Sequence, residues 1–526
     1  MNVPLVLTDF LDRAVEQYGE KVALIDDEKR LTYKQLNVRV NQLSRGLKSL
    51  GVEKGDKVAY LSPNTIEMLE GFYGVFQVGG VMTPLNTRLK PADYKFILTH
   101  SESKVLFVDE ELYPLVASIL SEVSGLTHVI IHGKQIDGYP AYDEWRTQYS
   151  GEDFEREELD ENDIASLLYT SGTTGDPKGV LLTHRSNYLH ALSAMHHLRV
   201  TDQDTLLHVL PMFHVNGWGS PFYYTANGST QVMLRKTDPK ILLDKVNKYK
   251  VTVMHMAPTV LNMVLEQYQT DKPNISQDVR VVIAGSAPPP AFVRKVEEDL
   301  GWEFMQVYGM TEISPLITTS VIRSTEANLT KEEKYRLKAK AGYGMIGSKV
   351  KVVDEHGEEI PHNGKAIGEI ITRTNTIMEG YFKNEEATQK TIRDGWLHTG
   401  DMATVDENGY IEIVDRMKDV IISGGENISS IEVEGALYEH DSVLEAAVVA
   451  VPHEKWGEVP HAVVVLREGH TVSEEELIQF SKEKLANFKA PKGISFAAEL
   501  PKTASGKIQK VLIRKEFWKE KDRLVN

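Results

Sequence analysis

The sequence contains no cysteine in its 526 residues. This absence excludes disulfides, thiolate nucleophiles, Cys-ligated zinc and iron–sulfur clusters. The first residues, MNVPLVLTDFLDR, have no basic segment ahead of their apolar side chains, and Asp9 interrupts the apolar run. We therefore expect no targeting signal. A disulfide-free chain of this size suits the cytosol, so a cytoplasmic location is expected.

Charged residues are absent from one long stretch, residues 205–234. About 20 apolar residues would suffice to span a membrane. Polar side chains and helix breakers interrupt this stretch, and a lipid-facing helix could not satisfy them. We expect no transmembrane segment and interpret the stretch as buried chain that lines an apolar cavity. The large side chains of the expected wall are Met212, Phe213, Trp218, Phe222, Tyr223 and Tyr224.

Positive charge is in deficit, with 59 Lys and Arg against 76 Asp and Glu, and the formal net charge is −17. As a whole, such a chain is a poor partner for nucleic acid. Residues 482–526 differ, because they carry 12 basic and 5 acidic residues, and this end suits polyanionic ligands. Hydrophobic residues at 41% and charged residues at 26% are typical of a soluble globular protein.

Apolar runs alternate with amphipathic helical segments over the first 300 residues or so. Runs at 58–62, 105–109 and 128–132 are predicted strands, and a helix is predicted between them at 64–79. A second helix is predicted over 32–50. Alternation of this kind indicates an α/β fold with layers of helices on parallel sheets.

The pattern changes after about residue 340. Short strands broken by turn residues predict a small antiparallel β-barrel there. The charged segment 331–340 is interpreted as a helical, exposed insertion. We predict two domains, a large N-terminal domain over 1–415 and a small α+β C-terminal domain over 416–526.

A loop rich in glycine and hydroxyl residues, YTSGTTGDPKGV, occupies Tyr169–Val180 between two apolar runs. Small residues let the backbone approach a polyanion closely, and hydroxyl groups and Lys178 add donors and charge. The spacing differs from a Walker A loop, in which Ser or Thr follows the lysine at the start of a helix. A phosphate-binding loop between two strands is predicted.

This loop resembles the phosphate loop of the adenylate-forming superfamily, which includes acyl- and aryl-CoA synthetases, luciferases and the adenylation domains of peptide synthetases. Four further segments resemble motifs of that family in the same order: QVYGMTE (306–312), DGWLHTGD (394–401), DRMKDVIISGGENISSIEVE (415–434) and PKTASGKIQK (501–510). The resemblance implies an ATP-dependent acid–thiol ligase that forms an acyl-adenylate and then an acyl-CoA. It also implies that the small domain moves on a hinge.

The resemblance implies sites for ATP and Mg2+. Glu312 and Thr170 would hold Mg2+, Tyr308 would stack on the adenine, and Asp401 would accept hydrogen bonds from the ribose hydroxyls. The further residues expected at the nucleotide are Ser171, Gly172, Thr173, Thr174, Gly175, Lys178, Gly285, Ser286, Ala287, Gln306, Gly309, Thr311 and Arg416.

The C-terminal motifs are expected to serve both half-reactions. By resemblance, Lys507 would contact the carboxylate and the α-phosphate as charge develops, and Lys418 would be the pivot of the hinge. Gly424 and Gly425 would border the pantetheine arm of coenzyme A, although an ordinary tight turn explains Gly424 equally well.

The acid itself is expected to be a fatty acid. The strings PMFHVNGWG and KEEKYRLKAKAG are similar to medium- to long-chain fatty-acyl-CoA synthetases. His214 would lie near the pantetheine and the acyl carboxylate, and Trp218 would gate the chain. An aryl- or short-chain acyl-CoA ligase stays open as an alternative, as do a stand-alone adenylation protein that loads a carrier, a luciferase-type oxygenase and a non-catalytic ATP-binding protein. A homodimer and peripheral contact with a membrane also stay open.

Overall fold

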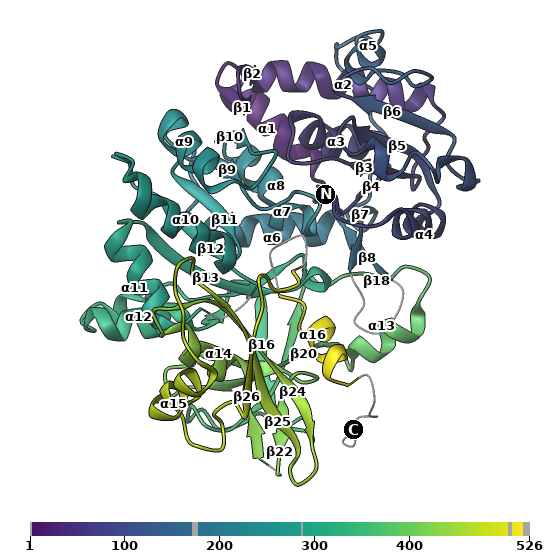
Figure 1. Cartoon of the computed structure of the whole chain (residues 1–526). Coiled ribbons are helices and arrows are strands. Elements are labelled where there is room, and N and C mark those ends of the chain that lie inside the picture. Colours follow the sequence, from purple (N-terminus) through teal and green to yellow (C-terminus); the bar gives the residue numbers. More distant parts are fainter. Residues whose placement is uncertain (1–2, 171–176, 286–287, 425, 503–507, 519–526) are drawn as a thin grey trace.

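The structure is a computed structural model that describes residues 3–170, 177–285, 288–424, 426–502 and 508–518. Within these ranges the strands form four sheets (Figure 1). Two large sheets are mainly parallel and carry helices, and two smaller sheets are mainly antiparallel. The predicted α/β class with a small antiparallel unit and an α+β end is confirmed. No helix in the described ranges has the length and apolar character needed to cross a membrane.

The first sheet contains the two strands that flank the expected phosphate-binding loop in the sequence. Its order is β18-β8-β7-β4-β3-β5-β6, and the four strands from β4 to β6 pair in parallel. β7 and β8 pair antiparallel on either side of residues 171–176, as the sequence predicts. The bounds are β3 Lys57–Leu61, β4 Val81–Pro84, β5 Ser103–Asp109, β6 His128–His132, β7 Ile164–Thr170, β8 Lys178–Thr183 and β18 Gly380–Tyr381.

The second sheet combines strands from distant parts of the chain. Its order is β15-β14-β13-β12-β11-β9-β10-β1-β2, and β1 pairs in parallel with β10 at Leu24 and Gln231. The bounds are β1 Val22–Asp26, β2 Lys29–Thr32, β9 Thr205–His208, β10 Thr230–Met233, β11 Val253–Met256, β12 Arg280–Ile283, β13 Glu303–Gly309, β14 Leu316–Thr319 and β15 Tyr343–Gly344.

Helices cover both large sheets, and their apolar faces follow the spacing in the sequence. In α2, Leu36, Val40, Leu43 and Leu47 are fully buried on one face. Thr32 caps α2 by accepting a hydrogen bond from the Gln35 amide. The bounds are α1 Thr8–Tyr18, α2 Tyr33–Ser49, α3 Ile66–Gln77, α4 Pro91–Ser101, α5 Tyr142–Arg146, α6 His184–His197, α7 Val215–Trp218, α8 Ser220–Ala226, α9 Pro239–Tyr249, α10 Pro258–Asp271, α11 Pro290–Asp299 and α12 Lys331–Ala339.

The interpretation of 331–340 as an exposed insertion is wrong for one face of α12. Tyr335 and Ala339 are buried in the core of the second sheet together with Val293 of α11. The Tyr335 hydroxyl also donates a hydrogen bond to Glu298, 3.2 Å away. The high charge of the segment masked these apolar residues, which fall at i and i+4.

The third and fourth sheets follow in sequence. The third has the order β16-β17-β20-β19 with β21 on β20, and the fourth has the order β23-β22-β25-β24 with β26 on β25. The chain passes from β21 to β22 through residues 417–420. The bounds are β16 Ser348–Val353, β17 Gly368–Thr374, α13 Glu385–Thr391, β19 Ile392–Arg393, β20 Trp396–Val405, β21 Ile411–Arg416, β22 Ile421–Ser423, β23 Glu426–Ile428, α14 Ser430–Tyr438, β24 Val443–His453, β25 Gly457–Leu466, α15 Glu474–Lys484, β26 Gly493–Phe496 and α16 Lys510–Phe517.

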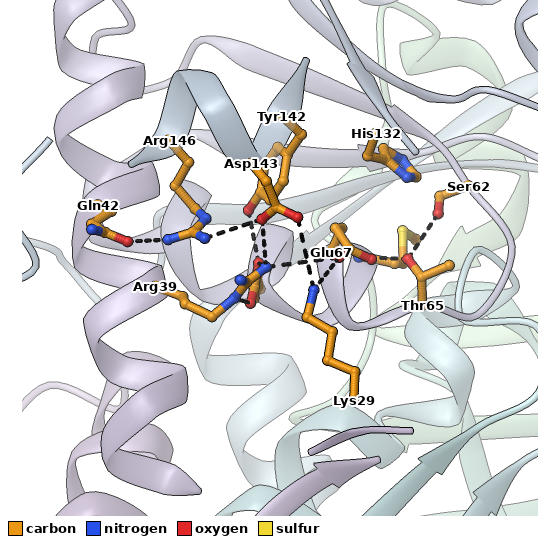
Figure 2. Close-up of polar contacts among 12 residues, drawn as sticks. Lys29, Arg39, Gln42, Ser62, Thr65, Glu67, His132, Tyr142, Asp143 and Arg146 are labelled. Atoms are coloured by element: carbon orange, nitrogen blue, oxygen red, sulfur yellow. Dashed lines mark hydrogen bonds and ion pairs between the residues drawn. The ribbon is translucent and has the colours of Figure 1, made fainter. Parts of the chain in front are cut away.

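A buried ionic network ties α2, α3 and α5 together (Figure 2). Arg39 of α2 pairs with Glu70 of α3, whose side chain is fully buried. The Tyr142 hydroxyl of α5 donates to the same carboxylate at 2.8 Å, and Asp143 accepts from Arg39 at 3.2 Å. A buried charge is costly unless it is paired and hydrogen-bonded, so the network fixes these three helices against one another.

Candidate active site

A cleft of about 3010 Å³ is bordered by all four sheets and by the connector 417–420. Residues that were predicted from separate motifs meet there. Those that line the cleft are Thr170, Lys178, His214, Trp218, Gly285, Gln306, Tyr308, Gly309, Thr311, Glu312, Asp401, Arg416 and Lys418. The predicted residues Ser171, Gly172, Thr173, Thr174, Gly175, Ser286, Ala287, Gly425 and Lys507 lie outside the described residues.

Glu312 lies in the cleft just beyond the end of β13, where the residue is 7% exposed. The Tyr381 hydroxyl of β18 donates to Glu312 Oε1 at 2.7 Å. Burial raises the pKa of Glu312, whereas the hydrogen bond from Tyr381 lowers it. Lys178 Nζ lies over the Tyr381 ring, 5.0 Å from its centroid. Tyr381 therefore links the exit of the phosphate loop to the carboxylate.

This setting fits a magnesium ion. Mg2+ is usually held by one or two carboxylates together with waters and substrate phosphates. Glu312 offers one buried carboxylate at the cleft, and Thr170 lies at the end of β7 on the same cleft. The residues present therefore suit the ion when a polyphosphate supplies the remaining ligands.

Tyr308, Asp401 and Arg416 form a second group. The Tyr308 hydroxyl donates to Asp401 Oδ2 at 2.7 Å, and Arg416 Nε lies 3.4 Å from Asp401 Oδ1. Asp401 and Arg416 are directly opposite each other on β20 and β21. These contacts fix the carboxylate in the lining of the cleft, where a ligand's hydroxyl groups could reach it.

Two of the predicted glycines have different physical reasons to be glycine. A Cβ on Gly309 would lie 1.7 Å from the Pro315 carbonyl oxygen, so no side chain fits between β13 and the turn that follows it. Gly285 has open space around it but a φ of +105°, which favours glycine.

The connector 417–420 is held by α16. Arg514 donates from Nη1 to the Lys418 carbonyl at 2.7 Å and lies 3.2 Å from Asp419 Oδ1. Lys510 pairs with Glu434 at 2.7 Å. Burial lowers the pKa of Lys418, and Arg416 nearby adds to the effect. The last described helix thus contacts the segment that links the third and fourth sheets.

Gly424 is in a tight turn and, among the described residues, is not part of the cleft lining. Its φ is +60°, and a Cβ would lie 2.7 Å from the Trp456 ring. Trp456 is 45% exposed and covers the turn. The turn itself therefore requires glycine, and its predicted role beside pantetheine stays a prediction.

Only part of the expected apolar wall faces the cleft. Phe213, Val215 and Trp218 line it, next to His214. Phe222 of α8, which was predicted to belong to the wall, is instead fully buried, and its ring packs edge-on to Phe72 of α3. Also among the described residues, Met212, Tyr223 and Tyr224 are buried away from the lining. For these four residues the expectation of a cavity wall was wrong.

Sequence reasoning missed two residues of the site. Tyr381 lies within the string EGYF and belongs to β18, a two-residue strand without periodicity. Only the pairing of β18 with β8 brings Tyr381 to Glu312. Arg514 follows the PKTASGKIQK motif, and a lone arginine in a helix gave no sign of its partner. Helical spacing shows which face of α16 is polar but does not identify a contact about 100 residues away.

Comparison with known proteins identifies the family of this chain and several of its relatives. The sequence model of the AMP-binding enzyme family matches residues 11–382, and that of the AMP-binding enzyme C-terminal domain matches residues 432–507. A long-chain-fatty-acid–CoA ligase of Thermus thermophilus is 39% identical over 98% of this chain and 96% of that protein. A peroxisomal trans-cinnamate:CoA ligase of Petunia hybrida is 37% identical over 97% of this chain and 94% of that protein.

Solved structures agree on the fold. An anthranilate CoA ligase, AuaEII, in complex with anthranoyl-AMP is similar with a TM-score of 0.90 and 28% identity, over 98% of both chains. The ATP-bound MatB of Rhodopseudomonas palustris is similar with a TM-score of 0.86 and 28% identity, over 98% of this chain and 99% of the other.

Proposed function

We propose, from the premise that this chain belongs to the AMP-binding enzyme family and is an AMP-forming acyl-CoA ligase, that its acid substrate is a fatty acid. The relative that is a long-chain-fatty-acid–CoA ligase, 39% identical, favours a fatty acid, and one observation carries the ligase chemistry. Glu312, Asp401 and Lys178 come from three separate motifs and meet in one cleft that is also lined by Phe213, Val215 and Trp218. A polyanion and an apolar acid can therefore be held side by side.

The reaction proceeds in two half-reactions. The carboxylate of the acid attacks the α-phosphorus of ATP, the bond to the bridging oxygen breaks, and pyrophosphate leaves. The thiol of coenzyme A then attacks the acyl carbonyl and AMP leaves. No cysteine or other protein nucleophile is required, in keeping with a sequence that has no cysteine.

Each group in the cleft has a proposed part. Asp401, held by Tyr308 and Arg416, binds the ribose hydroxyls, and the Tyr308 ring packs against the adenine. Glu312 and Thr170 would hold Mg2+, which supplies charge neutralisation at the phosphates. Lys507 stabilises the charge that develops at the α-phosphate, an effect for which one donor typically contributes about 10²- to 10³-fold in rate.

Named relatives favour a ligase but divide over the acid. They include a long-chain-fatty-acid–CoA ligase, a benzoate–CoA ligase and a butyrate–CoA ligase. An aryl or short-chain acid is therefore the second candidate. The wall of Phe213, Val215 and Trp218 is apolar and is compatible with both classes.

The experiment is pyrophosphate release from ATP with a panel of straight-chain, branched and aryl acids, with and without coenzyme A. Straight-chain acids should give the highest kcat/KM, and AMP and acyl-CoA should accumulate only with coenzyme A present. Benzoate or cinnamate as the best substrate would refute the fatty-acid proposal while leaving the ligase intact.

Lys507 separates the two half-reactions, when pyrophosphate release is used to follow the first and acyl-CoA formation to follow the second. Lys507→Ala should slow adenylate formation about 10²- to 10³-fold. Supplied with preformed acyl-adenylate and coenzyme A, this variant should make thioester at nearly the wild-type rate. Equal loss in both steps would contradict the role assigned to Lys507.

A further inference from the structure

The segment that carries Trp218 has an unusual backbone. Residues 215–219 all have positive φ, including Val215 at +48° and Trp218 at +57°. Residues other than glycine avoid this region, and a β-branched residue does so most strongly. The buried Asn216 amide donates to Ser166 Oγ at 2.8 Å and so fastens the turn to β7. Strained backbone held in this way is characteristic of functional sites.

The turn presents the Trp218 indole to the cleft, where the side chain is 6% exposed. Directly behind the indole lies His255 of β11, with ring centroids 6.0 Å apart and ring planes 22° from parallel. His255 is buried, and burial lowers its pKa to about 3, so its imidazole is neutral. The indole, which lines the cleft, and the imidazole behind it thus form two successive layers.

The space behind these layers is polar. The Tyr224 hydroxyl lies 3.2 Å from His255 Nε2, and the Tyr223 hydroxyl lies 3.4 Å from His255 Nδ1. Farther back, His208 Nε2 lies 2.9 Å from Gln231 Oε1. His190 lies beneath the turn, close to Gly219, and neither of its ring nitrogens has a hydrogen-bond partner among the described residues. All of these side chains are buried.

An alkyl chain gains affinity by roughly threefold to fourfold per methylene only while it enters apolar space. Past Trp218, the chain would have to displace a stacked imidazole and separate it from two tyrosine hydroxyls. Each separated polar group would be left buried and unpaired, which opposes binding. Extra methylenes beyond the indole should therefore gain nothing.

We infer that Trp218 and His255 form the end wall of the acyl site, so that the chain selects short- to medium-chain acids and rejects long-chain ones. This inference rests on the proposed function and narrows its substrate class. In this arrangement Trp218 closes the site rather than opening onto an apolar tunnel.

The test is kcat/KM for straight-chain acids from four to sixteen carbons. Wild-type kcat/KM should rise with length, reach a maximum at about six to ten carbons and fall at least tenfold by sixteen. Trp218→Ala alone should move the optimum little, because His255 remains. The double variant Trp218→Ala/His255→Val should move it to longer acids by two carbons or more. Trp396→Ala, on β20 and outside the cleft lining of the described residues, is the matched control and should leave the optimum unchanged.

Two results would overturn the inference. One is a wild-type protein that uses hexadecanoate as well as octanoate. The other is a double variant that keeps the wild-type melting temperature and the wild-type optimum. If the double variant fails to fold, the milder double variant Trp218→Leu/His255→Leu decides, and it should still move the optimum to longer acids.

Failure of the fatty-acid proposal gives a different pattern. In that case aryl acids are activated and straight-chain acids are not. Benzoates with para-alkyl groups of increasing length then probe the same wall. A sharp limit that moves in the double variant supports the wall, and an absent limit refutes it.

Discussion

Arg514 donates a hydrogen bond to the main-chain carbonyl of Lys418, 2.7 Å away. Through this bond the last described helix, α16, contacts the connector, which is the only segment among the described residues that leads from the third sheet to the fourth. The connector spans residues 417–420, and a rotation of the fourth sheet relative to the third must change the dihedral angles of the connector. Because the bond reaches from α16 to the backbone, it stabilises one orientation of the connector.

The first prediction concerns this bond. We take the orientation that this bond holds to be the one used for adenylate formation. Arg514→Ala should therefore slow adenylate formation by about tenfold to a hundredfold, since hydrogen bonds to charged groups contribute about 1.5–3 kcal/mol. Thioester formation from preformed adenylate should change much less. Arg514→Lys should restore part of the rate, and Glu516→Ala on the same helix is the control. Equal slowing of both steps would count against a role in orientation.

The second prediction concerns Tyr381 and Glu312. Tyr381→Phe removes the hydrogen bond that lowers the pKa of Glu312, so that pKa should rise further above its ordinary value. Because Mg2+ binds the ionised carboxylate, the acid limb of the pH–rate profile should move to higher pH. The Mg2+ concentration for half-maximal rate at neutral pH should rise roughly fivefold to tenfold.

Tyr410→Phe is the matched control for this prediction. Its hydroxyl donates to another buried glutamate, Glu326, at 2.6 Å, and within the described ranges Tyr410 is not part of the cleft lining. Its pH–rate profile and Mg2+ requirement should match the wild type. The same shift in both variants would show a general loss of stability instead.

The third prediction concerns Gly309. A methyl group there would lie 1.7 Å from the Pro315 carbonyl oxygen, and a backbone atom cannot move aside as a flexible side chain can. Gly309→Ala should lower the free energy of unfolding by about 3 kcal/mol, at the upper end of ordinary overpacking. Gly125→Ala, where nothing lies within 4 Å of the added Cβ, should stay within about 0.5 kcal/mol of the wild type. Thermal denaturation compares the two, and similar melting temperatures would contradict the clash.

The fourth prediction concerns Asp26 at the end of β1. Burial, with Glu67 and Asp27 close by, raises its pKa to about 6. Between pH 4 and pH 6 the folded protein therefore binds more protons than the unfolded chain, and stability falls as the pH rises through this window. At pH 7 the ionised Asp26 should cost about 1–3 kcal/mol.

Asp26→Asn should accordingly raise the melting temperature at pH 7 and change it little at pH 4. Asp137→Asn, which alters an exposed carboxylate in a loop, should have no effect at either pH. A gain that is the same at both pH values would contradict the titration of Asp26.

The sequence predicted the elements better than their long-range contacts. Periodic apolar residues locate α2, because burial of one helix face follows directly from spacing. The five motifs identify the cleft because their residue types are tied to phosphate chemistry. The role of Tyr381 was not predicted because β18 is only two residues long and its partner β8 lies about 200 residues earlier.

The uncharged stretch 205–234 shows a second limit. Trp218 faces the cleft and Phe222 packs in the core, yet both are aromatic residues in the same apolar run. Composition reports burial and does not distinguish a cavity wall from a core. The positive φ angles of Val215 and its neighbours, which decide the direction of Trp218, depend on contacts such as that of Asn216 with Ser166.

The parallel pairing of β1 with β10 has a consequence for synthesis. β1 leaves the ribosome roughly 200 residues before its neighbour, a delay of about 10–40 s at ordinary elongation rates of about 5–20 residues per second. During that interval the edge of β1 that later pairs with β10 is uncovered at Leu24 and Ile25, both of which are buried in the finished sheet. Nascent chains halted before residue 230 should therefore bind holding chaperones through this N-terminal segment and release them once β10 has emerged.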